Sequence, residues 1–166
     1  MLYFSYGSNM SIRRLCSRVP SARFVSIAAL QRHELRFHKV GRDGSGKCDA
    51  YETGNLEDVV WGVLFEIAAA EKPILDEKES LGYGYDEKDV VLTIPSGRTV
   101  TAFTYCAILI DPKLKPLSWY THHVVTGAEE NGLPEDYIEK IGQVESTADP
   151  DGDRDAREMA IYTLQS

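Results

Sequence analysis

A short polar turn near the start of the chain carries residue types suited to holding an anion. The segment Tyr6–Asn9 (Tyr-Gly-Ser-Asn) follows an apolar run at Leu2–Phe4, and Ser11 then begins a segment that has the pattern of a helix. A buried strand that ends at Gly and Ser and restarts as a helix leaves several backbone N–H groups unpaired, which favours anion binding. The alternative is a tight turn with no binding role, and the sequence of this segment by itself favours that interpretation.

Three carboxylates occur together where an expected helix ends. Asp76, Glu77 and Glu79 lie beside Lys78, and such a cluster is most often a solvated helix face. The functional alternative is that one carboxylate turns inward as a general base, where partial burial would raise its pKa toward neutrality. The residue types alone do not say which one.

Tyrosines are numerous and lie on expected strands or at turns, at Tyr3, Tyr6, Tyr83, Tyr85 and Tyr105. Each one alone is more often a core residue. Together they would supply hydroxyl groups around a small polar ligand.

Other residues that often do chemistry lack the spacing that the chemistry needs. The four histidines form no metal-binding pattern, and Ser5 and Ser8 lack the Gly-x-Ser-x-Gly context of a serine hydrolase. The glycine-rich loop at 41–47 fails the Walker pattern, and the acidic run at 149–155 fails the EF-hand pattern. We therefore expect no metal ion and no nucleotide at these places.

Composition and charge narrow the class of protein. The chain has 166 residues, which suits one domain over 1–166, and its formal charge of −8 argues against nucleic acid as a partner. Neither a membrane-spanning run nor a signal peptide is visible. Three widely spaced cysteines, Cys16, Cys48 and Cys106, indicate reduced thiols in a cytoplasmic protein.

The elements that must position these residues follow an α+β order. Periodicity and turn residues predict strands near 2–4, 22–40 (one bent strand or two), 48–53, 59–67, 89–94 and 99–110. They predict helices near 12–18, 68–79, 118–130 and 134–144, a turn at 82–85, and a last short helix or strand ending near Leu164. Strands and short helices come first, then a hairpin, then helices.

Four ordered segments together resemble the γ-glutamylcyclotransferase family. They are Leu2–Met10 (family pattern near YxxYGSNL), Val60–Val63 from its central strand, Leu75–Glu79 (LDxxE), and Gly127–Pro134 with Tyr137 (GAxENGLPxxY). They cover nearly the whole chain, and Met10 in place of the usual Leu is a small departure.

The resemblance implies a small closed barrel of mixed strands with helices packed outside. It also implies a reaction without a cofactor, in which the substrate's α-amine attacks its own γ-glutamyl carbonyl and releases 5-oxoproline and an amine or amino acid. That is a transferase or lyase type of cyclisation, and it connects the chain with glutathione metabolism. By match to the family, Glu79 would be the general acid and base.

The resemblance also implies that the substrate is a small γ-glutamyl molecule. The residues expected to bind it are Tyr3, Tyr6, Gly7, Ser8, Asn9, Tyr85 and Tyr105. A binding module that holds such a ligand without turnover is the alternative, and a related enzyme acting on γ-glutamylamines is a third hypothesis. The leaving group stays open at this point. So does the oligomeric state, with a homodimer as one option.

Overall fold

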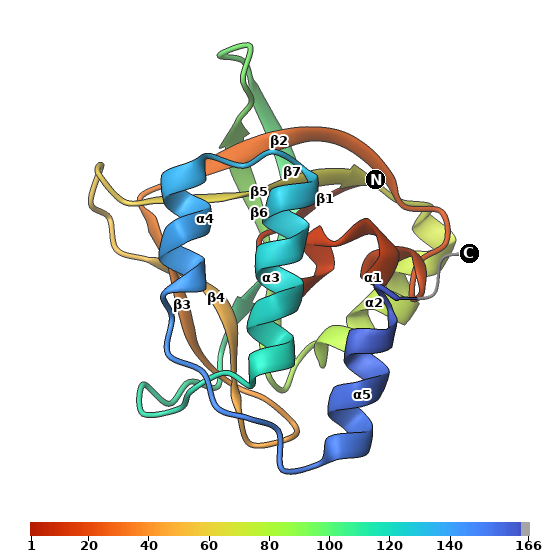
Figure 1. The fold of residues 1–166 in the computed structure, drawn as a ribbon. Helices are drawn as coiled ribbons and strands as arrows, with labels where there is room; N and C mark the ends of the chain where they lie inside the picture. Colours follow the sequence, from red (N-terminus) through yellow and green to blue (C-terminus); the bar gives the residue numbers. More distant parts are fainter. Residues whose placement is uncertain (164–166) are drawn as a thin grey trace.

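Five strands close into a mixed barrel in the computed structural model, which describes residues 1–163 (Figure 1). The barrel order is β1–β5–β2–β6–β7, and it closes where Tyr3 on β1 pairs in parallel with Phe103 on β7. The other barrel pairs are antiparallel. The barrel strands are β1 (Leu2–Ser5), β2 (Arg23–Gln31), β5 (Val59–Glu66), β6 (Tyr85–Thr93) and β7 (Thr99–Ala107). The predicted α+β fold with a closed mixed barrel is confirmed.

A separate two-stranded sheet and a set of helices surround this barrel. The sheet pairs β3 (His33–Val40) with β4 (Gly46–Glu52). Figure 1 shows α3 and α4 side by side across one face of the barrel, with α5 beyond the lower end of α3. The helices are α1 (Ile12–Cys16), α2 (Lys72–Glu79), α3 (Ser118–Glu130), α4 (Glu135–Gly142) and α5 (Gly152–Ala160), with short 3-10 turns η1 (Ser8–Met10) and η2 (Ala69–Glu71).

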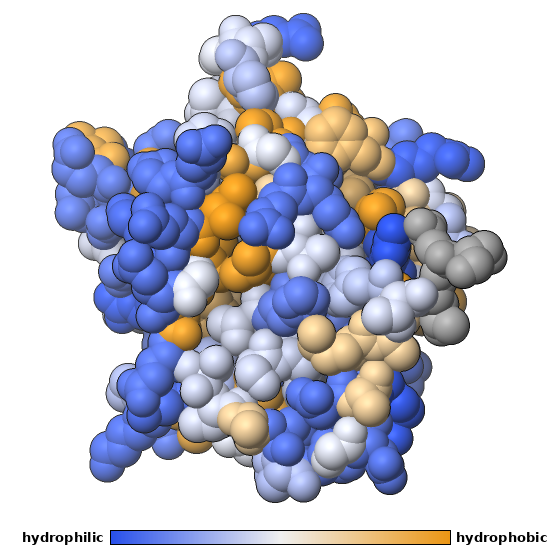
Figure 2. All heavy atoms as spheres, viewed as in Figure 1, coloured by the Kyte–Doolittle hydropathy of each residue, from blue (hydrophilic) through white to orange (hydrophobic). Residues whose placement is uncertain are grey.

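The outer surface of these helices is mainly hydrophilic, and hydrophobic atoms show between α3 and α4 (Figure 2). Within residues 1–163, none of the helices has both the length and the apolar character needed to cross a bilayer.

A glycine in the central strand allows two parts of the barrel to approach closely. A Cβ at Gly62 on β5 would lie 2.4 Å from the carbonyl oxygen of Ser5 and 2.7 Å from the ring of Phe4. Phe4 is fully buried at this contact. A glycine weakens a strand, and it occurs here because β1 packs too closely against β5 for any larger residue.

The structure resolves one alternative and moves several boundaries. The stretch 22–40 is two strands in different sheets, because Arg32 between them adopts a left-handed φ of 63° that turns the chain. Strand β6 begins at Tyr85, which the sequence placed in a turn, and its pairing with Ala107 explains the difference. The acidic run at 149–155 is partly helical, since Asp151 caps α5 by accepting a hydrogen bond from Arg154 N. The expected end near Leu164 lies outside the described residues.

Candidate active site

One small cavity collects the eight residues that the family resemblance assigned to catalysis or substrate binding. Its lining includes all eight of them, together with four further residues. The predicted ones are Tyr3, Tyr6, Gly7, Ser8, Asn9, Glu79, Tyr85 and Tyr105, and the others are Ser5, Cys48, Thr104 and Tyr120. The cavity has a volume of about 30 Å³, which is room for about two water molecules. It therefore takes only the reacting end of a ligand.

The turn at Tyr6–Asn9 forms one wall because the chain leaves β1 and immediately winds into η1. Met10 N donates to Gly7 O at 3.0 Å, while the backbone N–H groups of Gly7, Ser8 and Asn9 find no acceptor among residues 1–163. Helix α3 holds this turn from behind, since a Cβ at Gly127 would lie 2.4 Å from Ser11 N. The predicted set of unpaired donors is thus present and supported by packing.

Glu79 forms the opposite wall and is the last residue of α2. Pro73 occupies the first turn of this helix, where its missing N–H costs nothing. Ser80 adopts a left-handed φ of 57°, and Leu81 N donates to Asp76 O at 3.0 Å. This six-to-one bond ends the helix sharply and fixes the direction in which the Glu79 side chain leaves it.

Asn9 connects the two walls directly. Its Nδ2 donates to Glu79 Oε1 at 2.8 Å and lies 3.3 Å from the hydroxyl of Tyr3. Arg18 Nη1 donates to Asn9 Oδ1 at 3.2 Å and lies 3.5 Å from Glu79 Oε1. The Glu79 side chain is 17% exposed. The Glu79 carboxylate is therefore mostly buried, and the amide of Asn9 and the guanidinium of Arg18 orient it.

The tyrosine hydroxyls around the cavity stay protonated, and most already have acceptors. Tyr6 donates to the carbonyl oxygen of Tyr105, Tyr85 donates to the carbonyl oxygen of Cys48 at 2.5 Å, and Tyr105 donates to Asp76 Oδ1 at 2.6 Å. Burial, followed by the negative charge of Glu79, raises the pKa of Tyr3. The Tyr3 hydroxyl lies at the cavity wall, where it accepts from Asn9 Nδ2 and where Ser5 is its other polar neighbour.

The cysteines have the properties of fillers rather than nucleophiles. Burial raises the pKa of Cys48, which lines the cavity, to about 12, and that of Cys106 to about 11. At neutral pH both are thiols, which are poor nucleophiles. No group of His, Cys, Asp and Glu that could hold a metal ion occurs in the described part of the chain.

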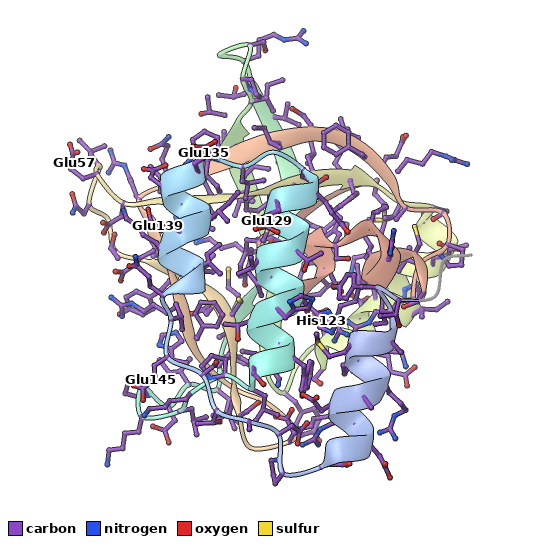
Figure 3. All side chains as sticks on the ribbon, viewed as in Figure 1. Glu57, His123, Glu129, Glu135, Glu139 and Glu145 are labelled. Carbon is purple, nitrogen blue, oxygen red and sulfur yellow. The ribbon has the colours of Figure 1, made fainter. Side chains whose placement is uncertain are left out.

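The buried histidine His123 has a structural role. His123 on α3 is fully buried beside α5 (Figure 3), where its Nε2 lies 2.7 Å from Glu158 Oε2 and its Nδ1 lies 2.6 Å from the hydroxyl of Tyr162. Arg14 from α1 also donates to Glu158. This cluster fastens α5 to α1 and α3.

Several residues at the site carry no signal in the sequence. Arg18 lies beyond the end of α1, and only the fold brings it to Glu79. Tyr120 reaches the cavity from α3 and accepts a hydrogen bond from Cys48 N at 3.0 Å. Asp76, one of the three carboxylates considered in the sequence, does not line the cavity but accepts the hydrogen bond of Tyr105, since it lies three positions before Glu79 and shares its helix face. Tyr83, by contrast, is 86% exposed and lies outside the cavity.

The closed mixed barrel holds one oriented carboxylate in a small cavity, and comparisons with known proteins show the family. Residues 59–141 match the model of the AIG2-like family. The human γ-glutamylcyclotransferase is 32% identical over 152 residues, which cover 87% of this chain and 78% of the human one. The chain therefore belongs to the γ-glutamylcyclotransferase family and is an enzyme of that kind.

Solved structures agree with this assignment. A structure described as a γ-glutamyl cyclotransferase superposes with a TM-score of 0.82 at 28% identity and covers 94% of this chain and 98% of its own. A yeast γ-glutamyl cyclotransferase described as specific to glutathione has a TM-score of 0.61 at 13% identity, covering 85% of this chain and 93% of its own. The second likeness concerns the fold alone.

Proposed function

We propose that this γ-glutamylcyclotransferase releases 5-oxoproline by an intramolecular reaction in which Glu79 is the general acid and base. The observation that carries the proposal is the 2.8 Å hydrogen bond from Asn9 to Glu79, which orients a carboxylate across one cavity from the donors of Gly7 and Ser8. A substrate folded between the two walls has its amine on the carboxylate side. Orientation of this kind supplies much of the acceleration for a reaction within one molecule.

The proposed steps balance without any external reactant. The α-ammonium group gives a proton to Glu79, and the free amine forms a bond to the γ-carbonyl carbon. The protonated Glu79 then gives its proton to the leaving nitrogen as the old carbon–nitrogen bond breaks. The ring nitrogen loses its second proton through Glu79 to the released amine, which leaves as an ammonium ion, and Glu79 is again a carboxylate. The products are 5-oxoproline and an amine.

The other cavity groups have supporting roles in this proposal. Unpaired N–H groups of Gly7 and Ser8 hold the α-carboxylate, as anion-binding turns do. The Tyr3 hydroxyl donates to the developing negative charge on the γ-carbonyl oxygen, where a fixed donor is worth about 3 kcal/mol. Tyr6, Tyr85 and Tyr105 shape the walls, since their own hydrogens are engaged elsewhere.

Substrates of the proposed reaction share a γ-glutamyl end, and glutathione belongs to this chemical class. Free thiols at Cys16, Cys48 and Cys106 fit the reducing cytoplasm as its location.

The test is a set of γ-glutamyl amino acids and γ-glutamyl amines incubated with the protein, with 5-oxoproline followed by NMR. We expect 5-oxoproline and free amine in equal amounts. Release of glutamate in place of 5-oxoproline would show hydrolysis by water and contradict the proposed cyclisation. Binding without any product on long incubation would instead support a binding module.

A further inference from the structure

A second, larger cavity borders the small cavity described above. It shares Ser8, Glu79, Tyr85 and Tyr120 with the first and has a volume of about 220 Å³. The γ-glutamyl end must react beside Glu79, and the inner cavity has little room. The leaving group of the proposed reaction therefore extends into this outer cavity.

The outer cavity is strongly basic, although the chain as a whole carries a formal charge of −8. Its acidic lining residues are Asp43 and Glu79. Its cationic lining residues are Arg14, Arg18, Lys39, Arg42, Lys47, Lys78 and Arg154. A concave surface lined mainly by one sign of charge favours ligands of the opposite sign.

Most of the enclosed cations are already paired. Arg14 pairs with Glu158, Lys47 with Asp43 at 2.8 Å, and Arg154 with Asp149 at 2.6 Å. Arg18 lies 3.5 Å from Glu79. Arg42 and Lys78 are exposed to solvent.

Lys39 on β3 differs from all of these. It is only 5% exposed, and its Nζ lies 4.5 Å above the ring of Tyr85 at the border of the two cavities. Among residues 1–163, no oxygen atom accepts a hydrogen bond from this ammonium group. A cation–π contact compensates part of the cost of burying it, but its three donors stay unused.

The ammonium group is thus prepared for an anion that the chain itself does not supply. Burial lowers the pKa of Lys39, although the charge of Glu79 opposes this effect. A ligand carboxylate next to Nζ would replace the lost hydration with a charge-assisted hydrogen bond.

We propose that Lys39 selects the leaving group by pairing with a carboxylate on the released amine, so that γ-glutamyl amino acids are preferred over γ-glutamyl amines that lack an acid. This inference rests on the proposed function, because it takes Glu79 as the point where the leaving group is released. Lys39 acts on specificity and takes no part in proton transfer.

The test compares two substrates that differ only in the carboxylate, γ-glutamylalanine and γ-glutamylethylamine. For the wild-type protein we expect kcat/KM to be about tenfold or more higher with γ-glutamylalanine, as a charge-assisted hydrogen bond allows. In Lys39→Met the preference should fall toward one, mainly through a higher KM for γ-glutamylalanine. Lys39→Arg keeps the charge and should keep most of the preference.

A matched control is Lys140→Met, which removes the same charge from the exposed face of α4, outside both cavities. It should leave the preference unchanged, and circular dichroism checks that each variant folds. Equal losses on both substrates in Lys39→Met would place Lys39 at the α-carboxylate and overturn the inference. A wild-type preference near one would overturn it without any variant.

The two proposals fail in different ways. If neither substrate released 5-oxoproline, the proposed function would be overturned, and this inference with it. If both released it at the same kcat/KM, only the selection by Lys39 would be overturned.

Discussion

Asn9 is the residue that connects the two halves of the site. Its amide donates to Glu79 and accepts from Arg18, so one side chain sets the distance between the turn and the carboxylate. Unlike the tyrosines, it is not part of the hydrophobic core, although it is buried and bonded to Tyr3, Glu79 and Arg18. The unfolding curve of an Asn9 variant therefore separates an effect on the orientation of Glu79 from an effect on stability.

For Asn9→Ala we expect kcat/KM to fall by about tenfold to a hundredfold, because an unrestrained carboxylate spends less time in the productive orientation. Steady-state 5-oxoproline release measures this. Asn55→Ala, in an exposed turn, is the control and should change nothing. Full activity in Asn9→Ala would show that Glu79 needs no orienting partner.

Helix α3 helps to position this site from outside the barrel. It presses Gly127 against the backbone of η1, where a Cβ would come within 2.4 Å of Ser11 N and 2.7 Å of Met10 C. Because backbone atoms cannot move aside like a flexible side chain, the helix or the turn must shift. The contact therefore couples helix packing to the position of Asn9.

Gly127→Ala should lower the free energy of unfolding by about 1–3 kcal/mol, as overpacking does, and should reduce kcat as the turn is displaced. Urea unfolding and activity measure the two effects. Gly142→Ala is the matched control, since nothing lies within 4 Å of the added Cβ. It should raise stability by about 0.5 kcal/mol, because alanine loses less backbone entropy than glycine. Equal effects of the two substitutions would contradict the role given to this contact.

Helix α5 is fastened to the rest of the molecule by the cluster of His123, Arg14 and Glu158. Burial by itself would raise the pKa of Glu158, but the hydrogen bond from His123 and the charge of Arg14 outweigh it and hold the pKa at about 2. Burial also lowers the pKa of His123. Both groups are therefore harder to protonate in the folded protein than in the unfolded chain.

Stability should accordingly fall with acid. The contribution of Glu158 is complete above its ordinary pKa of 4.5 and is lost as the pH falls toward 2, while His123 begins to oppose folding below 6.5. The loss for Glu158 amounts to at most about 3 kcal/mol. Urea unfolding at about pH 7 and about pH 3 measures it.

Glu158→Gln should lose stability at neutral pH and show a weaker dependence on acid. Glu139→Gln, on the exposed face of α4 (Figure 3), should match the wild type at both pH values. An unchanged acid dependence in Glu158→Gln would assign the effect to other carboxylates.

At the scale of the whole molecule, the sequence predicts the presence of a barrel and the residues that line the cavity. It does not predict the order in which the strands pair. The resemblance, carried by motifs such as Leu2–Met10 and Leu75–Glu79, implied a closed mixed barrel and drew attention to eight residues that line one cavity. The order of barrel strands, in which β1 pairs with β5 and β7, needs the structure, because nothing local in the chain encodes it. The roles of the eight cavity-lining residues in binding and catalysis are predictions.

Residues whose role depends on long-range contacts were the ones missed. Arg18 and Lys39 have no local pattern that separates them from ordinary surface cations, and Tyr120 looks like any aromatic residue of an amphipathic helix. Each reaches the site only after the barrel closes and α3 packs on η1. Boundaries such as that of β6 at Tyr85 moved for the same reason, since pairing with β7 overrides the turn tendency of the neighbouring glycines.

The uneven distribution of charge also predicts a dependence on salt. The net charge is −8, but the screening length in physiological salt is only about 8 Å, so the basic outer cavity dominates what a bound anion meets. For γ-glutamylalanine, kcat/KM should fall by roughly threefold between about 0.02 M and 0.5 M NaCl. γ-Glutamylethylamine, a zwitterion that lacks the leaving-group carboxylate and has no net charge, serves as the comparison. A rise with salt would show that the negative net charge dominates instead.

The most direct test of the account is Glu79→Gln, which keeps the size of the side chain and an oxygen that can accept the hydrogen bond from Asn9, while removing the base. We expect 5-oxoproline release to fall by at least about a thousandfold, as loss of an essential acid–base group does, while the variant keeps the wild-type unfolding curve and still binds γ-glutamylalanine in calorimetry. Release of 5-oxoproline at the wild-type rate by a folded Glu79→Gln protein would contradict it.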